Sequence, residues 1–176
     1  MLCKQGSTRS CLPLKVPVEA SAQNIQEQLG EAWLPRIYRE RILKLRTRSY
    51  HFDTASPSAR VEIQHTLLGV ELKLGRKRLL CPDLATARYL SVFARIGCQD
   101  VALPYDITKI SHLADELESS WYRMLLLAEQ EAKAESTRFR GRLRGLLLAN
   151  IRAEIAEAGA GTRVPEFRQS TRQRQI

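Results

Sequence analysis

The chain has 176 residues, a formal net charge of +9, 44% hydrophobic residues and 27% charged residues. This length suits one domain with a proper core and is too short for two ordinary ones, and the composition excludes a wholly disordered or fibrous protein. The positive charge favours an anionic partner, which means nucleic acid, anionic lipid or an acidic protein.

The cysteines and the apolar runs indicate whether the protein binds zinc, meets an oxidising compartment or spans a membrane. Cys3, Cys11, Cys81 and Cys98 form no CxxC pair and stand near no histidine at zinc-finger spacing. We therefore expect no zinc site, and interpret these thiols as buried or idle in a reducing compartment. The N-terminus has no continuous apolar run of the signal-peptide type, and the longest run elsewhere, 124–128, is far short of a membrane span. A cytoplasmic protein without membrane insertion is expected.

The first third of the chain indicates a leader followed by helix. Residues 1–22 carry Gly, Ser and Pro without periodicity, and indicate a flexible leader. A helix is expected from Asn24, which can act as its cap, with Glu27 completing a capping box. Pro35 then restarts a helix that is basic over much of its surface. Its cations are Arg36, Arg39, Arg41, Lys44, Arg46 and Arg48.

The middle of the chain predicts a small sheet. Strands are expected over 49–82, with a hairpin turn near Gly75. Asp83 is expected to cap a helix that stops at Gly97, and a short strand, 100–105, follows at once. Strand, helix and strand in this order indicate a right-handed crossover with a parallel strand pair. The predicted fold class is therefore α/β, with a small mixed sheet and one β-α-β crossover.

The last third predicts a helical hairpin. Apolar residues over 107–128 alternate steps of three and four, the spacing of a coiled-coil seam. A second helix can fold back at Ser136 and Thr137, whose hydroxyls can cap it. The alternative is one continuous helix that finds its partner in another chain. The expected units are a leader (1–22), a single domain (23–158) with a helical C-terminal half (107–158), and a basic disordered tail (159–176).

One set of residues fits a catalytic hypothesis. Glu71 and Lys73 stand two apart on a strand, with Asp53 and Glu62 as upstream acids. Metal-dependent nucleases of the restriction-enzyme type hold Mg²⁺ with two carboxylates and place a lysine near the scissile phosphate, and the order of elements here resembles their layout. A solvent-facing pair on a strand explains the same residues. Because no Walker, GxGxxG or GxSxG motif is present, we expect a non-enzymatic protein with no cofactor, or Mg²⁺ if it is a nuclease.

The favoured function is nucleic-acid binding by a basic surface. The candidate residues are Arg36, Arg39, Arg41, Lys44, Arg76, Lys77, Arg78, Arg138, Arg140, Arg142 and Arg144. Few aromatic residues lie among them, so salt-sensitive contacts with phosphates are expected rather than base stacking.

The alternative non-catalytic function is assembly. In that case the 107–128 seam would form a homodimer or dock a protein partner. The residues that would make the contact are Ile110, Leu117, Trp121 and Met124.

Overall fold

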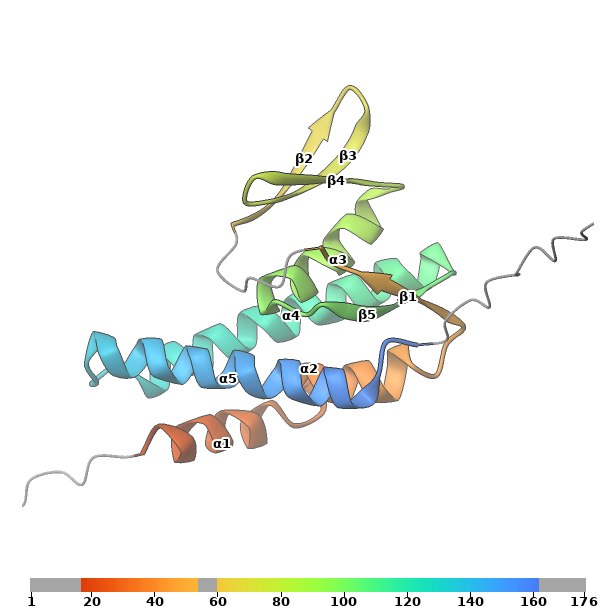
Figure 1. Ribbon diagram of the computed structural model, residues 1–176. Coiled ribbons are helices and arrows are strands. Elements are labelled where there is room, and N and C mark those ends of the chain that lie inside the picture. The colour runs from red at the N-terminus through yellow and green to blue at the C-terminus, as the bar shows by residue number, and fades with distance from the viewer. Residues whose placement is uncertain (1–16, 54–59, 162–176) are drawn as a thin grey trace, which may run out of the picture.

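Residues 17–53 and 60–161 are described in a computed structural model (Figure 1). The helices are α1 (Val18–Leu29), α2 (Leu34–Ile37), α3 (Leu84–Ile96), α4 (Ile107–Glu131) and α5 (Thr137–Ala158), and a π-helical turn (Tyr38–Ile42) continues α2. The strands are β1 (Thr47–His51), β2 (Val61–Thr66), β3 (Gly69–Leu74), β4 (Lys77–Cys81) and β5 (Asp100–Pro104). The α/β class with a long helical C-terminal half is confirmed. Most of the predicted leader and tail lies outside the described residues.

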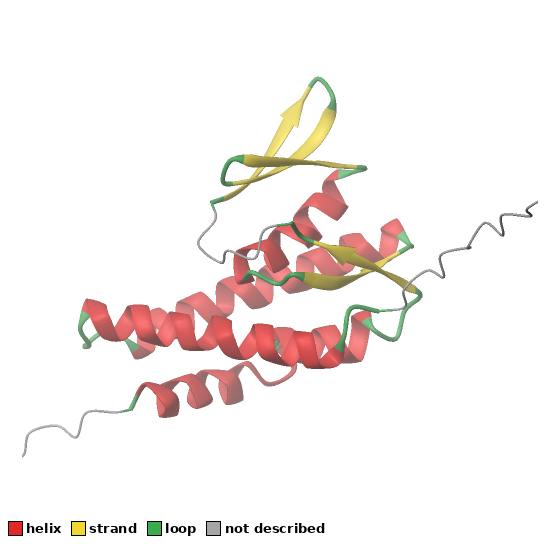
Figure 2. Cartoon of the chain, in the orientation of Figure 1, coloured by secondary structure: helices red, strands yellow, loops and turns green. Residues whose placement is uncertain are grey.

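The strands form two antiparallel sheets instead of one mixed sheet (Figure 2). β1 pairs with β5, while β2, β3 and β4 form a meander with its second turn at Gly75. The predicted parallel pair on either side of α3 is therefore wrong. β4, which precedes α3, pairs only with β3 among the described strands, and β5, which follows it, runs antiparallel to β1.

Two tyrosine hydroxyls make hydrogen bonds with the backbone of β5 at Ala102, on what we call its inner edge. The Ala102 N–H donates to Tyr38 Oη at 2.9 Å, and the Ala102 carbonyl accepts from Tyr89 Oη at 2.6 Å. Tyr38 Oη also donates to the Gly159 carbonyl at 2.6 Å. Burial raises the pKa of Tyr38 to about 12, so the hydroxyl stays protonated at neutral pH. Because both polar groups of Ala102 are satisfied, β5 offers no open position there for a parallel partner.

Removal of the Tyr38 hydroxyl is expected to destabilise the fold. Tyr38→Phe leaves the buried Ala102 N–H without its acceptor, which costs about 1–3 kcal/mol of unfolding free energy. Denaturant unfolding measures this loss. The matched control is Tyr122→Phe, because Tyr122 is 55% exposed; equal stability of the two variants would contradict the proposed role of the hydroxyl.

Three helices begin at capping residues, and two of these residues, Asp83 and Ser136, are predicted from the sequence. The bonds join Asp83 to the Thr86 N–H at 2.7 Å, Asp106 to the Thr108 N–H at 2.9 Å, and Ser136 to the Phe139 N–H at 3.3 Å. Ser136 therefore starts α5 after a short turn, and α4 and α5 are separate helices. The hairpin prediction is confirmed over the continuous helix.

The N-terminal helices differ from the prediction. α1 begins at Val18 with Pro17 as its cap, so the expected start at Asn24 is wrong; Asn24 lies within α1 and donates to Glu131 of α4 at 2.6 Å. The predicted basic helix over 36–48 is also too long. Its helical part ends at Ile42, and β1 takes over at Thr47 because its backbone pairs with β5.

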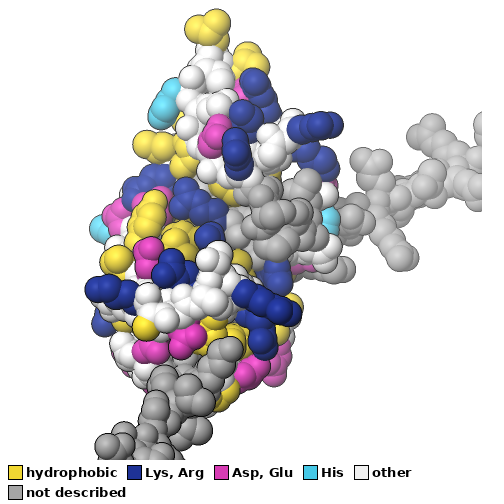
Figure 3. All heavy atoms as spheres, turned by 90° about the vertical axis from the view of Figure 1, so that its left-hand side faces the viewer, with side chains coloured by type: hydrophobic (Ala, Val, Ile, Leu, Met, Phe, Trp, Pro, Cys, Tyr) yellow, Lys and Arg dark blue, Asp and Glu magenta, His cyan; other side chains and the backbone are white. Residues whose placement is uncertain are grey.

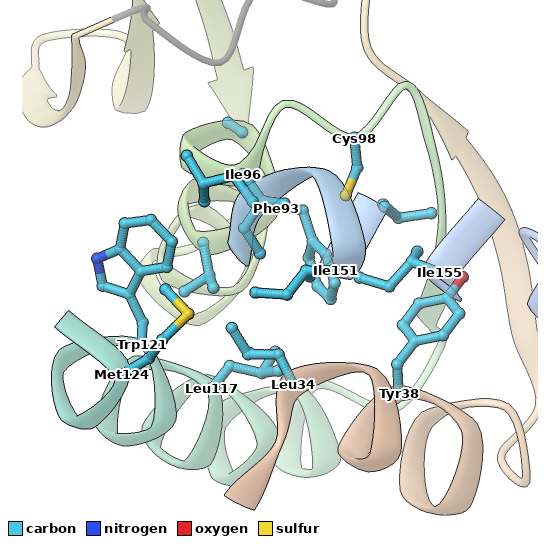
Figure 4. Packing of buried hydrophobic residues seen from close by; sticks show 14 of the residues in the cluster. Leu34, Tyr38, Phe93, Ile96, Cys98, Leu117, Trp121, Met124, Ile151 and Ile155 are labelled. Atoms are coloured by element: carbon cyan, nitrogen blue, oxygen red, sulfur yellow. The ribbon is translucent and has the colours of Figure 1, made fainter. Parts of the chain in front are cut away.

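The core lies where α1, α2, α3, α4 and α5 meet. Figure 4 shows Leu34 and Tyr38 facing Phe93 of α3, Leu117 of α4 and Ile151 of α5. All five side chains are at most 1% exposed. Among the described helices, none is long and apolar enough to cross a bilayer.

The apolar seam of α4 packs against other helices of the same chain. Ile110, Leu117, Trp121 and Met124 are each at most 4% exposed, and they pack against the other helices (Figure 4). A protein partner has no access to these four side chains while the fold is intact. Assembly of this protein would therefore require another surface.

Candidate nucleic-acid interface

The acids and the lysine of the nuclease hypothesis are only partly brought together. Glu62, Glu71 and Lys73 share the outer face of the β2–β3–β4 sheet, and Lys73 Nζ lies 3.5 Å from the Glu62 carboxylate. Glu71 is 8% exposed and accepts from the Thr66 hydroxyl at 3.3 Å. Arg78 approaches the second oxygen of Glu71 at 3.6 Å. These carboxylates are thus met by cations and a hydroxyl of the same sheet.

The fourth member, Asp53, lies elsewhere. It follows β1, and its carbonyl oxygen is 3.4 Å from Lys77 Nζ. Lys77 is the cross-strand neighbour of Leu74 and so belongs to the inner face of the sheet, opposite Glu71. Within residues 17–53 and 60–161, no three His, Cys, Asp or Glu side chains are placed to hold a metal ion. The structure therefore brings Glu62, Glu71 and Lys73 to one face of the sheet and places Asp53 apart from them.

The two described cysteines are buried thiols. Burial raises the pKa of Cys81 to about 11 and that of Cys98 to about 12. Their thiolate forms are negligible at neutral pH, so neither is an activated nucleophile.

The arginines of α2 and the π-helical turn are engaged by carboxylates of the same chain. Arg36 contacts Glu31 at 2.6 Å and Glu40 at 3.0 Å, Arg39 contacts Glu154 at 3.0 Å, and Arg41 contacts Glu116. Two of these four acids, Glu116 in α4 and Glu154 in α5, lie far away in the sequence. The basic charge of this segment is thus largely neutralised inside the fold.

The turn between β3 and β4 keeps part of its charge. Arg76 and Lys77 are exposed, while Arg78 is shared with Glu71. Figure 3 looks at the end of the molecule that carries this turn and the α4–α5 turn, and it shows Lys and Arg side chains from the sheet down to the helices, with acidic side chains between them. This view shows no uniformly basic surface.

Arg140 has a structural role within the α4–α5 turn. Its Nε donates to the Ala132 carbonyl at 3.2 Å, and its second nitrogen donates to the Lys133 carbonyl at 3.4 Å. These carbonyls end α4, where the helix dipole favours a cation. Arg140 therefore stabilises the turn between α4 and α5, whereas Arg138, Arg142 and Arg144 are exposed.

One face of α5 carries only arginine, glycine and alanine. At 100° per residue this face is about 120° wide and runs the length of the helix. Its eight members, which we call the RGA face, are Arg138, Gly141, Arg142, Gly145, Ala149, Arg152, Ala153 and Ala156. All are exposed except Arg152, which is half-buried. The RGA face thus has three cations and no acid.

No other element covers the RGA face near its glycines. Outside the backbone of α5, no atom lies within 4 Å of the positions that a Cβ on Gly141 or Gly145 would occupy. α5 lies in the foreground of Figure 1, with α1 along its lower side. The opposite face of α5 supplies Leu143, Leu147 and Ile151 to the core. The helix is therefore anchored on one side and open on the other.

The start of α5 has its charges arranged against the helix dipole. Arg138 stands in the first turn, where the positive end of the dipole disfavours a cation by about 0.3–1 kcal/mol, and Arg142 follows in the second turn. They are also four apart on the same face, so they repel each other. Neither has a carboxylate within 4 Å among the described residues. An external anion would relieve both penalties.

A hollow borders the RGA face at its C-terminal end. Its volume is about 650 Å³, and Arg152 and Ala156 line it together with Gln99 and Asp100. Asp100 is paired with His51 at 2.8 Å, and Arg152 donates to the Ile96 carbonyl at 3.4 Å. This is the one hydrogen bond that the Arg152 side chain makes within the described residues.

The sequence indicates Arg138 and Arg142 but not the face to which they belong. The further members are Gly141, Gly145, Ala149, Arg152, Ala153 and Ala156, of which only Arg152 is charged. Their helical spacing was the available signal. Which side of α5 is open could be decided only once the core was known.

Comparison of the chain with known proteins gives no further information on its function. It matches no family model, no curated protein and no solved structure.

Proposed function

We propose that this protein binds nucleic acid along the RGA face of α5 and has no catalytic role. The observation that carries the proposal is the composition of that face, which is exposed except at the half-buried Arg152 and consists of Arg, Gly and Ala alone. A polyanion laid along it meets cations without meeting an acid.

The small side chains favour nucleic acid over an acidic protein segment. Gly141 and Gly145 let a phosphate backbone approach the helix closely, where Arg138 and Arg142 reach its oxygens from the sides. An amphipathic partner helix would need apolar contacts, and the RGA face offers only the methyl groups of three alanines. Duplex DNA carries one charge per about 1.7 Å of axis, which suits repeated contact along a helix.

The proposal is tested by the salt dependence of binding to a 24-base-pair DNA duplex. Arg138→Gln with Arg142→Gln removes two phosphate contacts, and the slope of log K against log[salt] is expected to become shallower by about 1.8. Affinity at low salt is expected to fall by about tenfold or more. The matched control is Arg60→Gln with Arg123→Gln, which removes the same charge from two exposed positions outside α5.

The control separates a site from bulk charge. We expect the Arg60 and Arg123 variant to bind within about threefold of the wild type, because distant charges are screened within about 10 Å at 0.1 M salt. Equal losses in both variants would mean that total charge alone governs binding. Equally tight binding of polyglutamate would assign the RGA face to acidic proteins instead and overturn the proposal.

A further inference from the structure

A second basic cluster lies at the start of β1. Arg46 and Arg48 both place their guanidinium carbons near the ring of Tyr105, at 5.3 Å and 5.9 Å from its centroid. Tyr105 follows β5, donates its N–H to the Arg46 carbonyl at 3.3 Å, and is 48% exposed. Neither arginine has a carboxylate within 4 Å among the described residues. We call these three residues the end cluster.

The end cluster lies beyond the C-terminal end of α5. Gly161, which follows that end, approaches Thr47 so closely that a Cβ on it would be 2.5 Å from Thr47 Oγ1. Thr47 is the first residue of β1 and stands between Arg46 and Arg48 in the sequence. Figure 1 shows α5 running across the molecule from the α4–α5 turn to the start of β1. The arginines at the start of α5 and the end cluster are therefore at opposite ends of one helix.

The length of α5 sets the separation of its two ends. The helix has 22 residues, and at 1.5 Å per residue it is about 33 Å long. One turn of duplex DNA is about 34–36 Å and 10–10.5 base pairs. The two ends of α5 are therefore separated by about one turn of a duplex.

We propose that the ligand is a duplex held at two points, with the end cluster as the second contact and α5 as a rigid spacer about one turn long. This inference rests on the proposed function, because it takes Arg138 and Arg142, the arginines at the start of the RGA face, as the first contact. A duplex is stiff over about 150 base pairs, so the two contacts reinforce each other on it through a fixed effective concentration. A flexible single strand gains less from a fixed spacing.

The end cluster suits phosphate contact. The planar guanidinium groups of Arg46 and Arg48 present forked donors that match phosphate oxygens, and stacking on Tyr105 limits their freedom before the ligand arrives. Ordering these side chains in advance lowers the entropic cost of binding.

The test compares an 8-base-pair duplex, which reaches one contact at a time, with a 24-base-pair duplex, which reaches both. Arg46→Gln with Arg48→Gln is expected to weaken binding of the longer duplex by about tenfold or more, and of the shorter one by about twofold at most, since the other contact remains. Tyr105→Leu, which keeps both charges, serves as a milder second variant. Arg60→Gln with Arg123→Gln is again the charge-matched control, and far-UV circular dichroism verifies the fold.

Failure of this inference is distinct from failure of the proposed function. If the end-cluster variant loses the same factor on both duplexes, or loses nothing on either, the two-point mode is overturned while binding along α5 stands. If the wild type binds neither duplex, the proposed function itself fails. A longer duplex also offers more overlapping positions at which a single contact can form, and this alone raises its affinity. If the wild type binds the 24-base-pair duplex more tightly than the 8-base-pair duplex only by this statistical factor, the two-point mode is contradicted.

Discussion

Leu117→Glu is expected to unfold the protein. Leu117 is fully buried between helices, so the variant removes a core side chain and leaves an unpaired carboxylate in apolar surroundings. The expected loss exceeds about 4–5 kcal/mol, which is comparable with the whole stability of an ordinary domain. Circular dichroism and denaturant unfolding measure the effect, and Leu117→Ala, with an expected loss of about 2–5 kcal/mol, gives a variant that still unfolds measurably.

The same helix offers a matched control on its other side. Leu126 is 59% exposed, and Leu126→Glu is expected to change stability by no more than about 0.5 kcal/mol. A folded Leu117→Glu variant that merely dissociated from a larger assembly would contradict this account, because it would make the α4 seam an interface between chains.

Replacement of both helix glycines by glutamine is expected to strengthen the fold and weaken nucleic-acid binding. Glycine inside a helix costs about 1 kcal/mol relative to alanine and somewhat less relative to glutamine, and both sites have room for a side chain. Gly141→Gln with Gly145→Gln is therefore expected to raise the unfolding free energy by about 1 kcal/mol. The new side chains hold a duplex away from the RGA face, so affinity is expected to fall by about tenfold.

A variant that raises the unfolding free energy but lowers the affinity for nucleic acid identifies the replaced glycines as part of a contact surface, because a purely structural role would not weaken binding in a more stable protein. Gly141→Ala with Gly145→Ala is the control: it is expected to raise stability by up to about 2 kcal/mol and to leave affinity within about threefold, since a methyl group is small. Unchanged binding by the glutamine variant would show that the ligand does not approach this part of α5.

Local rules predicted those parts of the fold that depend on neighbouring residues. Asp83, Asp106 and Ser136 each bind a backbone N–H within three residues, so their helix starts are visible in the sequence. The β3–β4 turn at Gly75 is equally local, because the positive φ of 61° there favours glycine. These features needed no knowledge of the core.

The pairing of the strands depended on contacts that the sequence does not display. Strand, helix and strand usually indicate a parallel pair, but here the inner edge of β5 is satisfied at Ala102 by Tyr38 and Tyr89. Tyr38 is sixty-four residues away from Ala102. No local sequence pattern shows that side-chain hydroxyls will make the hydrogen bonds that a neighbouring strand would otherwise make.

The distribution of charge was predictable in outline but not in detail. The basic run predicts Arg39 and Arg41 as binding residues, whereas the fold brings Glu154 and Glu116 to them. Arg138 and Arg142 meet no such acid in the described chain, and they remain candidates. The distinction between a neutralised and a free arginine arises only from tertiary contacts.

The most direct test of binding along α5 is to locate a 12-base-pair duplex by amide chemical shifts of the ¹⁵N-labelled chain. We expect the amides of Gly141, Gly145 and Ala149 to shift on titration, while those around Tyr122 and Leu126, on the outer face of α4, stay in place. Shifts confined to the outer face of α4 or to the β2–β3 turn, with the glycine amides of α5 unmoved, would contradict the account.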